Sequence, residues 1–327
     1  MDKWDVVIIG AGPIGIACAL EAEKKGLNYV VIEKGCLVNS IYNYPRNMTF
    51  FSTSERLELD QIPFISANPK PTRTEALEYY RRVAVDRKLN IRLFEQVNTI
   101  IARKPGEFIL HTDNANYCCA NIIIASGFYD FPYLLDIPGE DLPKVRHYYD
   151  DPHYYAFQKV LIIGAMNSAV DAALETWRKG AEVTIVVRGS EIGSRVKYWV
   201  RPDIENRILE GSIKAYFNTT VEEILPTEVR LKTPQGRISV PNNFVIAMTG
   251  YQPNLDMLRN CGINLDPDNH MKPDYNEDTH ESNVSGIYLA GVICGGLNTH
   301  KLFIENSREH AVAIMSDIAS KTECGEI

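Results

Sequence analysis

The chain has 327 residues, 45% of them hydrophobic, and a formal net charge of −8. This length allows one large domain or two ordinary domains, and the scattered charges exclude the basic stripe of a nucleic-acid-binding protein. Seven cysteines, an odd number, in so long a chain argue against a secreted disulfide framework. We expect neither a signal peptide nor an apolar run of the ~18–20 residues that span a membrane, and therefore a soluble, cytoplasmic protein with no membrane partner.

The first expected elements are a strand, a turn and a helix that recur later in the chain. Residues 5–10 form the continuous apolar run of a buried parallel strand, the turn GAGPIG follows, and an Ala-rich helix extends to about Lys25. Three glycines recur, each 154 residues later: Gly10, Gly26 and Gly35 as Gly164, Gly180 and Gly189. The repeat predicts an α/β fold of two Rossmann-like, three-layer dinucleotide-binding domains.

The segments around the second repeat set the expected domain limits. Residues 36–73 are irregular and aromatic, residues 74–90 predict a helix, and short strands follow before a linker at 128–155. After the second repeat come further strands, then a strand and turn at SGIYLAGVICGG and a last helix from about Thr299. The chain is thus expected to return to its first domain, with residues 127–244 inserted between residues 1–126 and 245–327.

The first turn carries a complete G-x-G-x-x-G pattern at Gly10, Gly12 and Gly15. These glycines make the tight turn, let the backbone approach a pyrophosphate and allow close packing of helix on sheet. Pro13 suits the first helical position, where its missing N–H costs little. Glu33 ends the following strand, where a carboxylate accepts from ribose hydroxyls. With strand, helix and acid in place, the pattern predicts a dinucleotide site; a Gly-rich turn of an unrelated α/β fold is the alternative.

The second copy of the motif differs from the first at two positions. Val187 stands where the first copy has Glu33, and Arg188 follows it. An arginine binds a 2′-phosphate that a carboxylate would repel, which favours NADPH over NADH, although Arg188 could also be a solvated residue at a strand end. Met166 replaces the second glycine, so either the pyrophosphate lies farther from this turn or the Met166 side chain packs outward. Asn167, with Ser168 beside it, can still cap the helix and bind a phosphate.

Together these residues resemble flavoproteins of the low-molecular-weight thioredoxin reductase type. IIIASG and VIAMTGYQPN are similar to that group's paired Ala-Thr-Gly segments, and the resemblance covers nearly the whole chain. The stretches NSIYNYPRNMTFFSTSE, VKYWVRPDIENRI and THKLFIENSREHA resemble the YpdA family of bacillithiol disulfide reductases.

This resemblance implies FAD on the first repeat and NADPH on the second, with the NADPH domain inserted into the FAD domain. For FAD it implies contacts at Gly10, Gly12, Pro13, Ile14, Gly15, Glu33, Lys34, Val97, Ala125, Gly127, Gly291 and Lys301. For NADPH it implies contacts at Gly164, Ala165, Asn167, Ser168 and Arg188, and Arg195 and Lys197 could add charge. A homodimer is expected on the same ground.

Three positions depart from the family pattern. The thioredoxin reductase C-x-x-C is absent, Val292 replaces an acid that follows YLAG in most relatives, and Ile14 stands where many YpdA members have a cysteine. Cys294 is the candidate catalytic thiol, although a small core-filling residue is the favoured interpretation of it. Lys301, with the dipole of the last helix, is the candidate for stabilising negative charge on the flavin, and on its own would be read as a solvated lysine. No metal site is expected.

The predicted function is an NADPH-dependent, FAD-containing reductase of a low-molecular-weight disulfide such as bacillithiol disulfide. Two alternatives stay open. One is a thioredoxin reductase-like ferredoxin or flavodoxin NADP reductase, whose partner is a small redox protein and which also lacks C-x-x-C. The other is a flavin-bearing regulatory protein with little turnover, for which Met166 would weaken nicotinamide binding.

Overall fold

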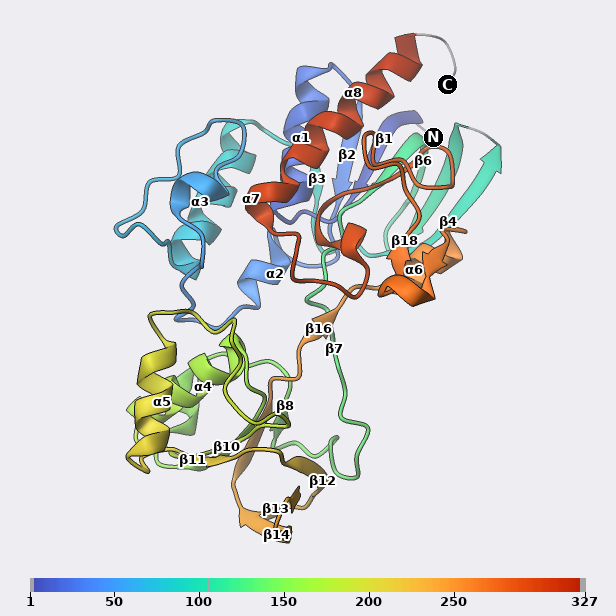
Figure 1. The fold of residues 1–327 in the computed structure, drawn as a ribbon. Coiled ribbons are helices and arrows are strands. Elements are labelled where there is room, and N and C mark those ends of the chain that lie inside the picture. Colours follow the sequence, from blue (N-terminus) through green and yellow to red (C-terminus); the bar gives the residue numbers. More distant parts are fainter. Residues whose placement is uncertain (1–2, 105, 324–327) are drawn as a thin grey trace. The chain divides into compact units, whose positions relative to one another are not determined.

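The computed structural model describes residues 3–104 and 106–323, which divide into two compact units. The first unit contains the described residues up to 42, then 49–131 and those from 251 onward, and the second contains 43–48 and 132–250. The second unit is therefore an insertion in the first (Figure 1). No helix within the described ranges combines the length and apolar character that crossing a membrane requires.

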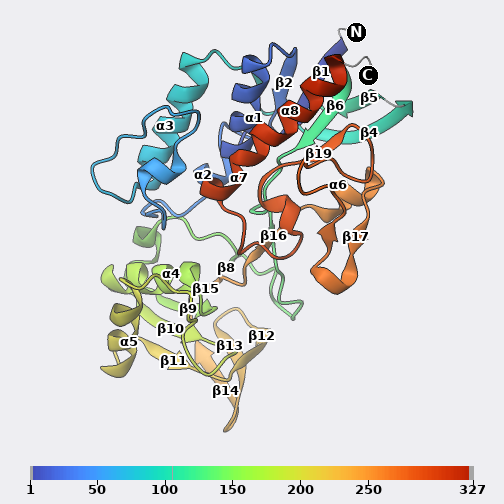
Figure 2. The same ribbon diagram turned by 45° about the horizontal axis from the view of Figure 1, so that its top comes forward.

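The sheet of the first unit has the strand order β3-β2-β1-β6-β5-β4, and β19 pairs with β6. Its parallel strands are β1 (Lys3–Ile9), β2 (Tyr29–Ile32), β3 (Ile91–Arg92), β6 (Asn116–Ile124) and β19 (Ile287–Leu289). Two antiparallel strands extend it, β4 (Val97–Lys104) and β5 (Glu107–Thr112). Helices α1 (Pro13–Lys24) and α8 (Glu309–Glu323) lie side by side in Figures 1 and 2. The last four residues of β1 and all of β2 are buried, as their apolar runs predict.

The remaining helices, 3-10 turns (η) and short strands complete the first unit. They are α2 (Asn39–Tyr42), η1 (Ser54–Leu57), α3 (Arg73–Asp86), α6 (Leu255–Asn260), β17 (Leu265–Asp266), η3 (Pro267–Asn269), β18 (Lys272–Pro273), η4 (Gly291–Gly295) and α7 (Ile304–Ser307). Helix α3 matches the predicted helix at 74–90 and begins at a capping box of Thr72 and Glu75. The last helix does not begin near Thr299 as expected: α7 begins at Ile304, and α8 follows it.

The second unit has a parallel sheet of order β11-β10-β9-β15-β8. Its elements are β8 (Val145–Arg146), η2 (Pro152–Tyr155), β9 (Lys159–Ile163), α4 (Asn167–Arg178), β10 (Glu182–Val186), α5 (Arg201–Leu209), β11 (Lys214–Tyr216) and β15 (Phe244–Ala247). An antiparallel sheet of β12 (Thr220–Ile224), β13 (Glu228–Thr233) and β14 (Gly236–Pro241) follows β11, and β7 (Phe131–Pro132) pairs with β16 (Tyr251–Gln252). The expected domain change between residues 244 and 245 falls inside β15, which pairs with β9 in the second unit.

Candidate functional site

The first glycine turn connects β1 to α1, and its three glycines meet different surroundings. A Cβ on Gly10, whose φ is +106°, would lie 2.6 Å from the carbonyl oxygen of Ala125, and a Cβ on Gly15 would collide with the carbonyl oxygen of Gly10. A Cβ on Gly12 would meet no atom within 4 Å. Packing within the protein therefore requires glycine at positions 10 and 15. The space beside Gly12 is left open, as a dinucleotide pyrophosphate would need.

Helix α1 presents its N terminus at this turn. Gly12 is the N-cap residue, Pro13 occupies the first turn, and no side chain caps the helix. The first N–H groups of an α-helix have no acceptor within the helix and favour an anion. The turn thus offers backbone donors next to the open space at Gly12.

Glu33 follows β2 and holds the turn from the other side. Its carboxylate accepts hydrogen bonds from the N–H of Ala11 at 2.8 Å and from the N–H of Gly35 at 2.9 Å, and the side chain is buried. Burial raises the pKa of this carboxyl, and the two N–H groups oppose the rise. Each carboxylate oxygen can accept more than one hydrogen bond, so the group retains acceptor capacity for a ribose.

The other predicted residues of the first repeat occupy different settings. Ala125 follows β6 and donates its N–H to Ile9 at 2.9 Å, which brings it to the turn. Gly127 has a φ of +73°. Val97 begins β4 and is buried. Lys34 forms an ion pair with Asp130 at 2.7 Å, so its ammonium group is already engaged within the first unit.

Gly291 lies against the same turn from the C-terminal part of the chain. A Cβ on Gly291, whose φ is +85°, would approach Ile14 to 3.3 Å. The N–H of Gly291 donates to Nδ1 of His310 on α8 at 3.2 Å. The structure therefore joins the predicted residues Ile14 and Gly291, and it adds His310, which the sequence reasoning did not identify.

Cys294, the candidate catalytic thiol, lies in η4 and is fully buried. Burial raises the pKa of its thiol, and Sγ lies 3.9 Å from Nδ1 of His310. A thiolate rather than a thiol attacks disulfides. These surroundings favour the core-filling interpretation of Cys294 over a nucleophile.

His280 stacks on His310 with ring centroids 4.0 Å apart and planes inclined by 25°. Burial lowers the pKa of His310 to about 4 and also lowers the pKa of His280, so both rings are neutral near pH 7. Nitrogen and sulfur atoms of His280, His310 and Cys294 lie within 4.8 Å of one another. The lone pairs of ring nitrogens lie in the ring planes, so two nearly parallel stacked rings do not direct them at one ion.

Lys301, the second candidate catalytic residue, lies three residues before the start of α7, and its side chain is exposed. Its carbonyl oxygen accepts from the amide of Asn306 at 2.8 Å, while the Asn306 oxygen accepts from the N–H of Phe303 at 2.7 Å. These bonds shape a loop at 301–303, which is why the last helix starts later than expected. The expected helix start at Thr299 is therefore wrong, and the role of Lys301 and the helix dipole toward the flavin stays a prediction.

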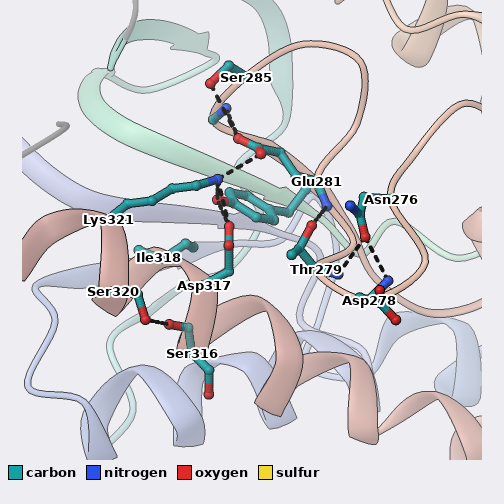
Figure 3. Close-up of polar contacts among 12 residues, drawn as sticks. Asn276, Asp278, Thr279, Glu281, Ser285, Ser316, Asp317, Ile318, Ser320 and Lys321 are labelled. Carbon is teal, nitrogen blue, oxygen red and sulfur yellow. Dashed lines mark hydrogen bonds and ion pairs between the residues drawn. The ribbon is translucent and has the colours of Figure 1, made fainter. Parts of the chain in front are cut away.

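A polar network fastens α8 to the segment that leads into Gly291 (Figure 3). Lys321 contacts carboxylate oxygens of Glu281 and Asp317, each at 2.7 Å, and the hydroxyl of buried Tyr288 at 3.0 Å. The Tyr288 hydroxyl also donates to Asp317 at 2.7 Å. The network holds β19, which leads into η4 and Gly291, against α8, which carries His310.

The second turn, between β9 and α4, keeps only part of the first turn's geometry. Gly164 has a φ of +135°, and a Cβ there would lie 2.6 Å from the carbonyl oxygen of Met248. Met166 is the N-cap residue of α4, and a Cβ on Gly193 would lie only 2.2 Å from its Sδ. The Met166 side chain therefore packs onto a segment after β10, and its distance from a pyrophosphate stays a prediction.

The remaining predicted residues of the second repeat surround this turn. Ala165 accepts at its carbonyl oxygen from the N–H of Gly193 at 2.9 Å, and Ser168 is exposed at the start of α4. Val187 is buried and Arg188 exposed. Lys197 is largely buried and forms an ion pair with Asp171 of α4 at 2.9 Å, so its charge is compensated within this unit.

Comparison with known proteins finds relatives that match nearly the whole chain. The family model described as pyridine nucleotide-disulphide oxidoreductase matches residues 7–291. Bacilliredoxin reductase Bdr of Bacillus subtilis is 42% identical over 98% of this chain and 99% of its own length. The bacillithiol disulfide reductases Bdr (YpdA) of Staphylococcus aureus and Bacillus cereus superimpose with TM-scores of 0.95 and 0.94, at 38% and 41% identity. Those matches cover 98% of this chain and 99% and 100% of theirs.

Proposed function

We propose a specific reaction for this chain, which belongs to the pyridine nucleotide-disulphide oxidoreductase family and, within it, to the Bdr (YpdA) reductases. The chain is an oxidoreductase, and its family implies a flavin and a nicotinamide nucleotide as cofactors. The reaction that we infer is the reduction of a low-molecular-weight disulfide of the bacillithiol disulfide kind by NADPH, through FAD. One NADPH and one proton would yield NADP⁺ and the two thiols. We further propose that it acts as a homodimer in the cytoplasm.

The contrast between equivalent positions of the two repeats carries this proposal. Glu33 closes the first turn with a fixed, buried carboxylate suited to a ribose, and Gly12 leaves the backbone open to a pyrophosphate. At the second turn the acid is replaced by Val187 and an exposed Arg188. The first pattern supports FAD, and the second supports a nicotinamide cofactor with a 2′-phosphate.

A bound flavin would take a hydride from the nicotinamide and pass two electrons to the acceptor. The residues of the chain would bind and orient the two nucleotides: the N terminus of α1 and Glu33 for FAD, and Gly164, Asn167 and Arg188 for NADPH. Gly291, held by His310, would complete the wall beside Ile14.

The acceptor side of the proposal rests on what the cysteines offer. The sequence has no C-x-x-C, position 14 is isoleucine, and the described cysteines are all free. Cys294 is buried with a raised pKa, which disfavours a relay through a protein thiolate. A small disulfide that approaches the flavin directly is consistent with this arrangement. The names of the relatives also include a bacilliredoxin reductase, so a small redox protein belongs in the test.

The test is an anaerobic titration of the purified, flavin-loaded protein with NADPH, followed in the flavin absorption band. We expect the band to bleach, and to recover on addition of bacillithiol disulfide but not of ferredoxin or flavodoxin. Recovery only with ferredoxin or flavodoxin would replace the disulfide reductase by an NADP reductase of small redox proteins. Recovery only with an oxidised bacilliredoxin would move the acceptor to that protein. Absence of bleaching would leave a flavin-bearing regulatory protein.

A further inference from the structure

We propose that Met166 anchors the segment 188–197, here called the anchored loop, to the N terminus of α4, and that this anchoring presents Arg195 as a second cation for the 2′-phosphate of NADPH. The inference rests on the proposed use of the second repeat for NADPH. It gives Met166 a positioning role at the place where the first repeat has Gly12.

Two backbone hydrogen bonds tie the strand end before the anchored loop, and the middle of the loop, to adjacent residues of the second turn. At its start, the carbonyl oxygen of Val186 accepts from the N–H of Gly164 at 3.0 Å. At its far side, Gly193 donates its N–H to the carbonyl oxygen of Ala165 at 2.9 Å. The loop is therefore tied to consecutive residues, 164 and 165, and cannot move away at one end without breaking a backbone hydrogen bond.

Met166 fills the contact between turn and loop. A Cβ on Gly193 would lie only 2.2 Å from its Sδ, so the Met166 side chain leaves no room for a side chain at residue 193. The sizes of the two residues are complementary, because the long side chain of Met166 leaves space only for a glycine at position 193. The first repeat has a glycine, Gly12, in its turn, whereas the second repeat has Met166 in its turn and a glycine, Gly193, in the loop that contacts it.

Asn167 fixes the segment that follows Gly193. Its Oδ1 accepts from the N–H of Lys197 at 2.8 Å, and its Nδ2 donates to the carbonyl oxygen of Arg195 at 3.2 Å. The Lys197 ammonium turns inward to Asp171. Because the backbone on both sides is held, Arg195 is presented at the N terminus of α4 with an exposed side chain.

The charge pattern of the second unit points to an anion at Arg188 and Arg195. Arg178, Arg201 and Arg207 of α4 and α5 all form ion pairs with acidic residues. Neither Arg188 nor Arg195 has an ion-pair partner in the part of the chain that the structure describes. Two guanidinium groups can share the oxygens of a phosphate dianion through charge-assisted hydrogen bonds. Arg195 reaches this role only while the loop is anchored.

The direct experiment is isothermal titration calorimetry with adenosine 2′,5′-bisphosphate and with 5′-AMP, which share all but the 2′-phosphate. For Arg195→Ala we expect the bisphosphate to bind about tenfold more weakly and 5′-AMP to be unchanged, as loss of one charged hydrogen bond predicts. Met166→Gly should also weaken the binding of the bisphosphate. Met166→Leu, which keeps an apolar side chain at this position, should weaken it less. The double variant of Met166→Gly with Arg195→Ala should be no worse than Arg195→Ala alone.

A second set of measurements separates the anchor from the ligand. Gly193→Ala should weaken bisphosphate binding because the new methyl group displaces Met166, and it should have little further effect in the Met166→Gly background. Trypsin should cut after Arg195 faster in Met166→Gly than in the parent protein. Tighter binding of both nucleotides by Met166→Gly would instead identify Met166 as an obstruction, and unchanged cleavage and affinity would show that the loop needs no anchor.

Failure of this inference is distinguishable from failure of the proposed function. If the parent protein binds bisphosphate no better than 5′-AMP and NADPH does not bleach the flavin, the NADPH assignment itself fails. If the parent protein prefers the bisphosphate but Arg195→Ala retains that preference, only the role of Arg195 and its anchor is overturned.

Discussion

Alanine substitutions at two glycines of the first turn should separate cofactor binding from folding. Gly12 has a φ of −71°, which alanine adopts readily, and no atom lies within 4 Å of the added Cβ. Alanine is a poorer N-cap residue than glycine by up to ~1 kcal/mol, and the entropy lost from the unfolded chain offsets ~0.4–1 kcal/mol of this cost. We therefore expect Gly12→Ala to change the free energy of unfolding of the flavin-free protein by less than about 1 kcal/mol.

Gly15→Ala should behave in the opposite way. Its Cβ would collide with the carbonyl oxygen of Gly10. Gly10 has no room to shift, because its Cα is packed closely against the carbonyl oxygen of Ala125. Forcing a methyl group into a closed backbone contact costs typically 1–3 kcal/mol, and here both partners are fixed, so we expect a loss of about 3 kcal/mol.

The two variants are compared in urea unfolding of the flavin-free protein and in FAD titration followed by flavin fluorescence. In Gly12→Ala the methyl group occupies the space that a pyrophosphate needs, and we expect FAD affinity to fall about 30-fold, or ~2 kcal/mol. The reasoning is refuted if Gly12→Ala binds FAD as tightly as the parent protein, or if it destabilises the flavin-free protein as much as Gly15→Ala does.

Three further outcomes are expected. Arg188→Ala should raise the KM for NADPH about tenfold and leave that for NADH nearly unchanged, as loss of one charged hydrogen bond predicts; equal losses in steady-state kinetics would contradict the 2′-phosphate assignment. His310 has a depressed pKa of about 4 in the folded protein, so its contribution to stability is present above pH 6.5 and lost as the pH falls toward 4. Urea unfolding at several pH values should show this loss, up to about 3 kcal/mol, in the parent protein but not in His310→Asn. The asparagine keeps an acceptor for the N–H of Gly291. Equal dependence of the unfolding free energy on pH in the two proteins would contradict the role of His310. Lys321→Met should lower the free energy of unfolding of the first unit by about 2 kcal/mol, because it leaves two partly buried carboxylates without their cation. The control Lys104→Met breaks the exposed ion pair with Glu107 and should lower it by less than about 1 kcal/mol. Equal losses in the two variants would contradict a stabilising role of the network.

The sequence allowed us to predict the features of the fold that depend on residues close to one another along the chain. The strands of the repeats are continuous apolar runs, and the glycines of the first turn satisfy backbone requirements within a few residues of each other. The α/β class follows from the repeat, the insertion of one unit in another follows from the strand, turn and helix after the second repeat, and both agree with the structure. Helix α3 was predictable because its capping box is a local signal.

Features that depend on distant partners were beyond the sequence. The direction of the Met166 side chain is decided by Gly193, on a loop after the next strand. Lys197 counts as an available cation from its position alone, and only the fold shows that Asp171 neutralises it. The late start of the last helix depends on Asn306. Its side chain forms hydrogen bonds with the backbone of residues 301 and 303, and these bonds hold the segment before α7 in a loop instead of a helix.

His310 shows the same limit at the candidate flavin turn. In the sequence it is one histidine on an amphipathic helix, and nothing in its spacing connects it with Gly291. In the structure, burial against His280 keeps it neutral, and a neutral ring with an unprotonated Nδ1 is what the N–H of Gly291 requires. A histidine that was charged at pH 7 would have no acceptor to offer at this position.

The cysteine inventory and the glycine turns together restrict how electrons can leave this protein. A thiolate relay needs an accessible, low-pKa thiol, whereas burial raises the pKa of Cys294 and position 14 supplies only an aliphatic side chain against Gly291. With no C-x-x-C in the sequence, the acceptor would meet the flavin itself. Substituting Cys294 by alanine should accordingly leave acceptor turnover within about twofold of the parent rate, since the residue then contributes packing alone. Loss of turnover with an unchanged flavin content and an unchanged rate of bleaching by NADPH would restore the thiol to the reaction.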